Sequence, residues 1–270
     1  MREIVRRQVR LWKTATHAEW RRCFRADYRI EDPVGTGFRA MGRYEAEWAN
    51  MHTSALRLDM EIFGLIVGGD EIVADLRAVT HLGTRGVGPD AVDAMRSTLS
   101  YTGIYSVDET GLLATNRTFA DPVDDTLWRA FYPTLAPPSE RPLPSRGPMQ
   151  LAQAVEDHLY FWNTDRREAW RRRFREDARI EDPVGSGARL LEDGSAVWSA
   201  AHAQDRRILL GCHRKIVGGM EVLTHGVRTE ERTGMSPRMT VQTELFGFDS
   251  DGWITSWRVF REEPESSRSA

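Results

Sequence analysis

The sequence predicts an α+β protein made of two tandem domains, each a mostly antiparallel sheet wrapped by helices. Three observations lead to this prediction. The chain has 270 residues, about twice the length of a common domain. Its two halves repeat one another, with a Pro-rich stretch between them. Within each half, helical periodicity comes first and strand-like segments follow, which is the element order of an α+β layer architecture.

The repeat is clearest when the chain is compared with itself at an offset of 150 residues. Segments 24–37 and 174–187 then differ at only three of 14 positions. Towards the end of each half the offset falls to 141, which predicts a nine-residue longer loop in the first half, within 82–92. A repeat of this length is a duplicated domain, because solenoid repeats are far shorter.

The Pro-rich stretch sets the expected domain boundaries. We expect the first domain at residues 1–136, a linker at 137–148 and the second domain at 149–270. Clustered prolines continue neither a helix nor a strand ladder, because proline lacks the backbone N–H that both need.

The elements follow the same order in each half. In the first half, apolar residues recur every three or four positions over 4–12, which predicts an amphipathic helix. A short helix around 20–24, a strand and a third helix come next. The remaining segments are rich in strand-forming residues. In the second half, 239–248 and 253–260 flank an Asp-Ser-Asp-Gly turn, which predicts a closing hairpin.

Composition excludes several classes of protein. A content of 40% hydrophobic and 29% charged residues with a net charge of −3 is typical of an ordinary globular chain. Although 35 of the 37 basic residues are Arg, interleaved Asp and Glu cancel their charge, so no nucleic-acid partner is predicted. Apolar runs stay below the roughly 18 to 20 residues of a membrane span, so no membrane partner is predicted either.

The same inspection predicts neither metal nor cofactor. Cys23 and Cys212 are the only cysteines, and they lack metal-ligand spacing. The sequence has no dinucleotide fingerprint and no phosphate-binding loop. The charged N-terminal residues are unlike a secretory signal, so we expect a cytoplasmic protein.

Asp32 and Asp182 are the main candidate catalytic residues. Strand alternation places Asp32 on the same face as Ile30, and Pro33 favours an extended backbone at Asp32. Apolar surroundings disfavour a charged carboxylate, so we expect its pKa to be raised and the group to act as a general base. The structural alternative is an Asp that caps a turn.

The run Ile-Glu-Asp-Pro-Val-Gly, preceded by Phe-Arg-x-Asp and a helical N-terminus, resembles the base-bearing segment of ketosteroid isomerases, within the NTF2-like and SnoaL-like superfamily. The resemblance implies two cone-shaped domains, each a curved sheet wrapped by helices around a deep apolar pocket. It implies that Asp32 and Asp182 hold the position of the proton-shuttling base. It also implies that the two domains form an internal pseudo-dimer, with a homo-oligomer left open.

The resemblance further implies donors for a developing oxygen charge, and here the sequence departs from the family. Counting back 24 residues from the base gives Gln8 and His158, where the family has Tyr. Aligning the closing hairpins gives Gly103 and Glu244, where the family has a protonated Asp. The second half is therefore the expected active copy, with Asp182 as base and Glu244 and His158 as donor or acid. The alternatives are a solvated strand carboxylate for Glu244 and a core histidine with satisfied ring nitrogens for His158.

Other residues are candidates for binding the substrate. Gln8 lies on the apolar face of its helix, and Tyr101, two residues before Gly103, is placed to supply a hydroxyl in the first half. The remaining candidates form two pairs spaced i, i+4 on the third helix of each half, namely Trp48 with His52 and Trp198 with His202. In dehydratases of the superfamily a His partners the acidic residue. The alternative is a helix that packs on the sheet with its His at the wet edge.

Together these features predict a cofactor-independent acid–base enzyme, an isomerase or a lyase, that acts on a hydrophobic or aromatic small molecule. Isomerisation of a ring ketone is closest by motif, while dehydration or retro-aldol cleavage needs the same base. Two alternatives remain. One is a polyether-type epoxide hydrolase or cyclase, whose second acid has at best Asp59 or Glu61 here. The other is a non-catalytic ligand-binding protein of the NTF2-like class.

Overall fold

The computed structural model describes residues 1–14, 16–53, 56–82, 96–120, 147–191 and 195–261. The chain divides into two compact units, Met1–Arg141 and Pro142–Ala270. The longer loop expected from residue 83 onward lies outside the described residues, as does the expected linker up to residue 146. None of the helices in the described ranges is long and apolar enough to cross a membrane.

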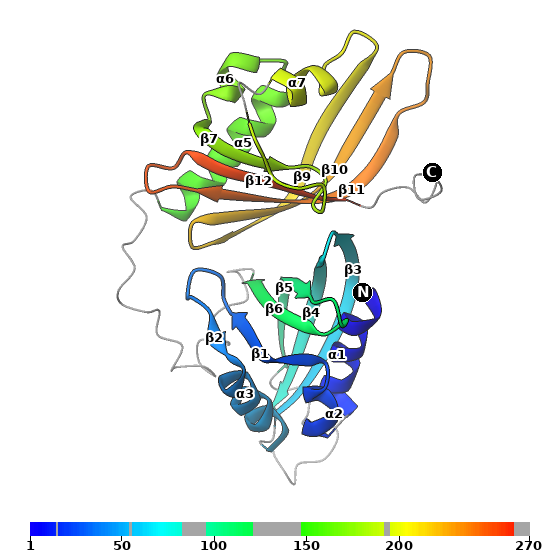
Figure 1. The fold of residues 1–270 in the computed structure, drawn as a ribbon, viewed down its shortest axis with the longest axis vertical. Helices are drawn as coiled ribbons and strands as arrows, with labels where there is room; N and C mark the ends of the chain where they lie inside the picture. Colours follow the sequence, from blue (N-terminus) through cyan, green and yellow to red (C-terminus); the bar gives the residue numbers. More distant parts are fainter. Residues whose placement is uncertain (15, 54–55, 83–95, 121–146, 192–194, 262–270) are drawn as a thin grey trace. The chain divides into compact units, whose positions relative to one another are not determined.

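The first unit is one mixed sheet with helices packed against it (Figure 1). Its helices are α1 (Arg2–Thr14), α2 (His17–Arg21) and α3 (Met41–Thr53). Its strands are β1 (Phe24–Glu31), β2 (Arg39–Ala40), β3 (Leu56–Gly68), β4 (Glu71–Leu82), β5 (Arg96–Val107) and β6 (Leu113–Ala120). They lie in the order β2-β1-β6-β5-β4-β3, and all described pairs except the parallel β1–β6 pair are antiparallel.

The second unit repeats this topology. Its helices are α5 (Pro148–Asn163), α6 (Arg167–Arg171) and α7 (Ser195–Ala201). Its strands are β7 (Phe174–Glu181), β8 (Arg189–Leu190), β9 (Arg206–Gly218), β10 (Glu221–Arg232), β11 (Arg238–Phe248) and β12 (Ile254–Arg261). The strand order is β8-β7-β12-β11-β10-β9, with β7 and β12 as the parallel pair. The predicted α+β class and tandem, mostly antiparallel sheets are confirmed, and the element order agrees with the NTF2-like fold that the resemblance implies.

Strand register shows that the sequence alignment of the two halves is also an alignment in space. Gly103 pairs with Thr118 across β5 and β6, and Glu244 pairs with Val259 across β11 and β12. Both pairs differ by the predicted offset of 141 residues. Positions 103 and 244 are therefore equivalent within their units.

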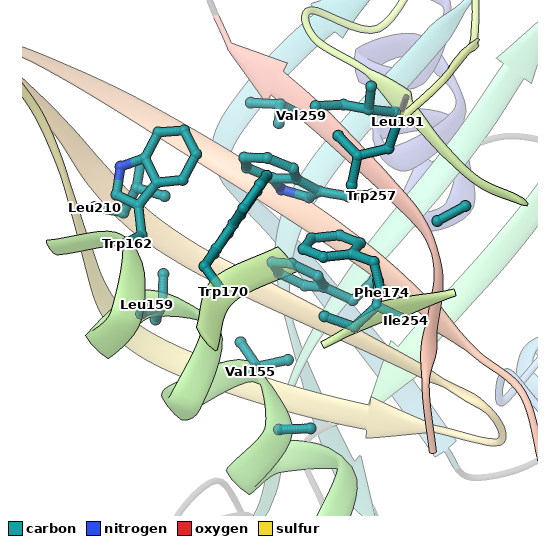
Figure 2. Close-up of a cluster of buried hydrophobic side chains, with 14 of the residues drawn as sticks. Val155, Leu159, Trp162, Trp170, Phe174, Leu191, Leu210, Ile254, Trp257 and Val259 are labelled. Carbon is teal, nitrogen blue, oxygen red and sulfur yellow. The ribbon is translucent and has the colours of Figure 1, made fainter. Parts of the chain in front are cut away.

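Aromatic packing joins the first helix of the second unit to its sheet (Figure 2). Trp162 of α5 packs edge-on against Trp170 at a ring-centroid distance of 5.4 Å and against Trp257 of β12 at 5.6 Å. The indole Nε1 of Trp162 donates to the carbonyl oxygen of Ile208 at 2.8 Å, so its polar atom is satisfied inside the core. Burial of such side chains stabilises the fold by about 1.5 to 3 kcal/mol each. These contacts hold α5 and β12 in place around the site described below.

Candidate functional site

The residue before each candidate base clamps the turn that follows it. Glu31 ends β1, and its Oε1 accepts hydrogen bonds from the backbone N–H groups of Gly35 at 3.1 Å and Gly37 at 3.2 Å. Its Oε2 accepts from Arg117 Nε at 2.9 Å. The Asp32–Pro33 peptide within this turn is cis. The clamp determines where the Asp32 carboxyl group lies, a role that the sequence interpretation missed.

The second unit repeats the clamp with Glu181. Its Oε1 accepts from the N–H of Gly185 at 2.9 Å, and its Oε2 accepts from Arg258 Nε at 3.0 Å. Burial opposes ionisation of Glu181, but these hydrogen bonds outweigh it and lower its pKa. Gly185 has φ 98°, a conformation that favours glycine. Glu181 repeats Glu31 at the offset of 150, and Arg258 repeats Arg117 at the offset of 141. This repetition was the sequence signal that could have revealed the clamp.

The second unit contains a cavity of about 300 Å³ that Asp182 and Glu244 both line. Its apolar lining comes from α5, α7 and the sheet, and consists of Trp162, Ala196, Val197, Ala200, Ala201, Ile208, Leu210, Trp257 and Val259. Its polar lining consists of Asp182, Arg189, Arg206, Arg228, Gln242, Glu244 and Arg261. The expected apolar pocket is therefore corrected to one with a strongly charged wall. The sequence interpretation missed this because strand register brings the arginines together from four different strands.

Asp182 lies at this charged wall as one half of an ion pair. Its Oδ1 contacts Nη1 of Arg261, and its side chain is 24% exposed. Burial raises the pKa of Asp182, while the positive charges of Arg261, Arg228 and Arg189 lower it, and burial has the larger effect. Asp182 is therefore a carboxylate that is more basic than usual, held in place by a cation.

Glu244 is the second carboxyl group at the cavity and is only 3% exposed. Its Oε1 accepts hydrogen bonds from Gln242 Nε2 at 3.0 Å and Trp257 Nε1 at 3.3 Å, and the Thr224 hydroxyl donates to its Oε2 at 3.3 Å. Burial raises the pKa of Glu244 to about 7; the Trp257 hydrogen bond opposes this shift, and the charge of Asp182 adds to it. Because Oε1 already accepts two N–H groups, the neutral form carries its proton on Oε2.

His158, a predicted donor or acid, lies in the aromatic core and is absent from the cavity lining. It is 0% exposed, with its ring 4.9 Å from that of Trp257 and 5.1 Å from that of Phe246. Burial lowers the pKa of His158 to about 3, so the ring is neutral at physiological pH. Its counterpart Gln8 is buried in the same way, at 2% exposure. His158 is therefore a core residue, but both of its ring nitrogens are buried without a hydrogen-bond partner among the described residues, so it differs from the satisfied core histidine of the alternative.

His52 and His202, the other predicted acid–base candidates, both contact main-chain carbonyl oxygens through both ring nitrogens. In His202, Nδ1 lies 3.2 Å from the oxygen of Trp198 and Nε2 lies 2.9 Å from that of Trp162. His52 makes the corresponding contacts with Trp48 and Trp12, each at 2.7 Å. Each histidine therefore fastens the third helix of its unit to the end of the first, which leaves no ring nitrogen for a substrate.

The predicted binding residues Trp48 and Trp198 are buried core residues that stack on these histidines. Their ring centroids lie 3.7 Å and 4.1 Å from those of His52 and His202. Trp198 is 5% exposed and is not among the residues that line the cavity of the second unit.

In the first unit the charge of the candidate base acts on four tyrosines. Asp32 is half-buried, and its pKa rises to about 7 through burial and the nearby charge of Glu47, with Arg39 opposing. Burial is also the main cause of raised pKa values in the tyrosines that experience the charge of Asp32, which are Tyr28, Tyr44, Tyr101 and Tyr105. Tyr101, predicted to supply a hydroxyl, donates it to Sδ of Met60 at 3.1 Å.

Gly103 cannot be replaced by a larger residue without movement of its neighbours. A Cβ atom at this position would lie 2.6 Å from Cε2 of Tyr105 and 3.1 Å from Oδ1 of Asn116. The Tyr105 ring thus crowds the position from which Glu244 projects in the second unit.

In the described ranges, no group of three or more His, Cys, Asp or Glu side chains is arranged to hold a metal ion.

Several solved structures are similar to part of this chain. One is an LEH-like epoxide hydrolase from M. tuberculosis, at 20% identity and a TM-score of 0.38, over 42% of this chain and 84% of that one. A second is the epoxide hydrolase/cyclase-like enzyme SalBIII, which has a role in pyran ring formation in salinomycin. It is 21% identical with a TM-score of 0.37, over 42% of this chain and 92% of that one. A third is a putative SnoaL-like polyketide cyclase from Shewanella denitrificans. It is 10% identical with a TM-score of 0.38, over 43% of this chain and 92% of that one.

At these identities the similarity concerns the fold alone. No protein-family model and no curated protein sequence matches the chain.

Proposed function

We propose that the second unit is a cofactor-independent acid–base enzyme, an isomerase or a lyase, that acts on a small molecule with a largely apolar body. Asp182 is its general base and Glu244 its proton or hydrogen-bond donor. One observation supports this most directly: the two carboxyl groups line one cavity but have opposite surroundings. Asp182 is paired with a cation, whereas the hydrogen bonds described for Glu244 come from neutral groups. Such a separation is how two acids divide the roles of base and acid.

The base step uses the ionised form of Asp182. The ion pair with Arg261 keeps its carboxylate charged and oriented, while burial makes it more basic than a solvated Asp. A substrate C–H next to a carbonyl group gives its proton to this carboxylate. In an isomerisation Asp182 returns the proton to another carbon of the same substrate.

The acid step uses the neutral form of Glu244. Removal of the C–H proton drives negative charge onto the carbonyl oxygen, which needs a donor in a site that water does not fill. The proton on Oε2 of Glu244 supplies that donor, because a pKa of about 7 leaves about half of the molecules protonated near neutral pH. Gln242 and Trp257 hold the other oxygen and so orient the group.

The same pair of groups suits three outcomes. Return of the proton to carbon gives an isomerase, and departure of a β-hydroxyl that Glu244 protonates gives a dehydrating lyase and water. In a retro-aldol cleavage Asp182 instead takes the proton of a substrate hydroxyl, the C–C bond breaks to release formaldehyde, and the carbanion that remains takes up the proton. An epoxide would be opened by water that the base activates, with the acid protonating the leaving oxygen. The test therefore needs a panel that includes β,γ-enones, aryl-substituted diols and epoxides.

The experiment compares Asp182→Asn with the matched variant Asp32→Asn on that panel. We expect Asp182→Asn to lower kcat at least about 100-fold on any substrate that the intact protein turns over, because a general base contributes about that much or more. We expect Asp32→Asn to stay within about threefold.

Two results would contradict the proposal. A larger loss with Asp32→Asn would assign the chemistry to the first unit. Absence of turnover on the whole panel would favour the ligand-binding alternative.

A further inference from the structure

We infer that the cavity of the second unit selects an apolar organic acid, whose carboxylate binds between Arg228 and Arg261 while its body lies against the apolar lining. This inference rests on the proposed function and names the substrate class of the same site.

Positive charge at the cavity exceeds the negative charge available to neutralise it. Arg189, Arg206, Arg228 and Arg261 all line the cavity. Arg206 and Arg228 share one carboxylate, that of Glu230, at 2.9 Å and 3.5 Å. Glu230 also binds Arg232 at 2.8 Å, so its charge is divided among three guanidinium groups. A carboxylate from a ligand would neutralise part of this excess positive charge.

Arg228 is the arginine whose charged form a ligand carboxylate would stabilise most. Its side chain is only 14% exposed, and its contact with Glu230 is the longest of the three. Burial and the nearby positive charge of Arg261 both disfavour the charged guanidinium, which lowers its pKa. A buried guanidinium is stable when a carboxylate accepts from its N–H fork, and such charge-assisted pairs are strong in a partly dry site.

Strand register places the two arginines on the cavity side of the sheet. Arg228 pairs with Leu210 across β10 and β9, and Arg261 pairs with Gln242 across β12 and β11. All four side chains line the cavity. The acid is therefore expected to bind at the same wall as Asp182, next to the proposed base.

Three of the four cavity arginines are peculiar to the second unit, whereas Arg189 corresponds to Arg39. At the offsets that align the two halves, Arg206, Arg228 and Arg261 correspond to Leu56, Ala78 and Ala120. The shared scaffold therefore does not need these charges. Arg206 and Arg261 each have a carboxylate partner within the unit. Arg228 contacts Glu230 only at 3.5 Å, and because a buried cation costs stability unless it is well paired, a ligand carboxylate explains this arginine better than folding does.

The test measures binding of two probes of equal shape to the full-length protein by isothermal titration calorimetry. The probes are 2-naphthylacetate and its neutral amide, 2-naphthylacetamide. We expect the acid to bind at least tenfold more tightly than the amide, and Arg228→Gln to reduce this preference below threefold. The matched control is Arg232→Gln, which removes a contact with the same Glu230 from an exposed side chain outside the cavity lining and should keep the preference.

A second pair of variants separates this inference from the proposed function. Asp182→Asn is expected to abolish turnover yet bind the acid at least as tightly, because it frees Arg261 from its ion pair. If Arg228→Gln fails to fold, as judged by its thermal transition, Arg261→Gln replaces it. The inference is overturned if acid and amide bind equally, if neither binds, or if the arginine variants leave the preference unchanged. Absence of catalysis with the acid preference intact would overturn only the proposed function.

Discussion

The two units have the same strand order and the same clamped Asp-Pro turn, yet they surround the candidate base with different chemistry. In the first unit the charge of Asp32 acts on four tyrosines, and burial raises its pKa to about 7. In the second unit Asp182 is paired with Arg261 and shares its cavity with Glu244. The comparison teaches that the scaffold determines where the carboxyl group lies, while the residues on neighbouring strands determine its protonation.

Neighbouring positions around the second carboxyl group differ together between the two units. Glu244 receives an indole N–H from Trp257, whereas the first unit has Asn116 at the Trp257 position and Gly103 at the Glu244 position. The space that a side chain at 103 would need is taken by the Tyr105 ring. The two units therefore carry a polar side chain at different strand positions, Glu244 on β11 in the second and Asn116 on β6 in the first. A single substitution would not convert one site into the other.

The largest expected effect is on stability as a function of pH. The pKa of Glu244 is raised from 4.5 to about 7 in the folded protein, so its favourable contribution is complete below pH 4.5 and is lost as pH rises through about 7. At about 1.4 kcal/mol per pKa unit, this corresponds to roughly 3 kcal/mol. We expect Glu244→Gln to raise the free energy of unfolding by about that amount at pH 8 and to change it little at pH 4, as measured by urea denaturation.

Glu230→Gln is the control of opposite sign. Burial opposes ionisation of Glu230, but its arginine partners outweigh it and lower its pKa, so its contribution is present above its ordinary pKa and is lost as pH falls through the lowered value. This variant should be less stable than the parent at pH 8. A pH-independent effect of Glu244→Gln would show that burial of Glu244 does not oppose its ionisation.

A smaller effect tests why the first unit lacks the second acid. Gly103→Ala would place a Cβ atom 2.6 Å from the Tyr105 ring, and such overpacking typically costs about 1 to 3 kcal/mol. In a Tyr105→Leu background the same change should cost less than half as much, because the crowding ring is gone. Equal costs in the two backgrounds, measured by urea denaturation, would mean that the ring does not determine the residue at 103.

The smallest effect is expected at the helix position that differs between the units. His158→Gln introduces the residue that the first unit has at this point, Gln8. Because the ring of His158 is buried among aromatic side chains, we expect turnover within threefold of the parent, assayed on whichever substrate of the panel is active. A tenfold loss of turnover with an unchanged thermal transition would contradict this expectation and indicate a catalytic role for His158.

Much of the fold and part of the site were predictable from sequence, because they depend on short-range patterns. The repeat, the helix-then-strand order and the hairpin offset align Asp182 with Asp32 and Glu244 with Gly103 in the two units. The i, i+4 spacing likewise predicts that His202 neighbours Trp198, and their rings do stack. The same spacing is silent about Trp162, whose carbonyl oxygen, 40 residues earlier, contacts the second ring nitrogen.

Local pattern in the chain therefore determined the architecture, the duplicated Asp-Pro turn that holds Asp182 and the strand position of Glu244. Tertiary structure alone decided which groups surround them: Arg228 and Arg261 are 33 residues apart, yet both line the cavity of Asp182. The reason is the distance along the chain over which each effect acts. Backbone propensity and side-chain alternation act over a few residues, whereas the charge and burial that set protonation depend on groups that only the sheet register brings together.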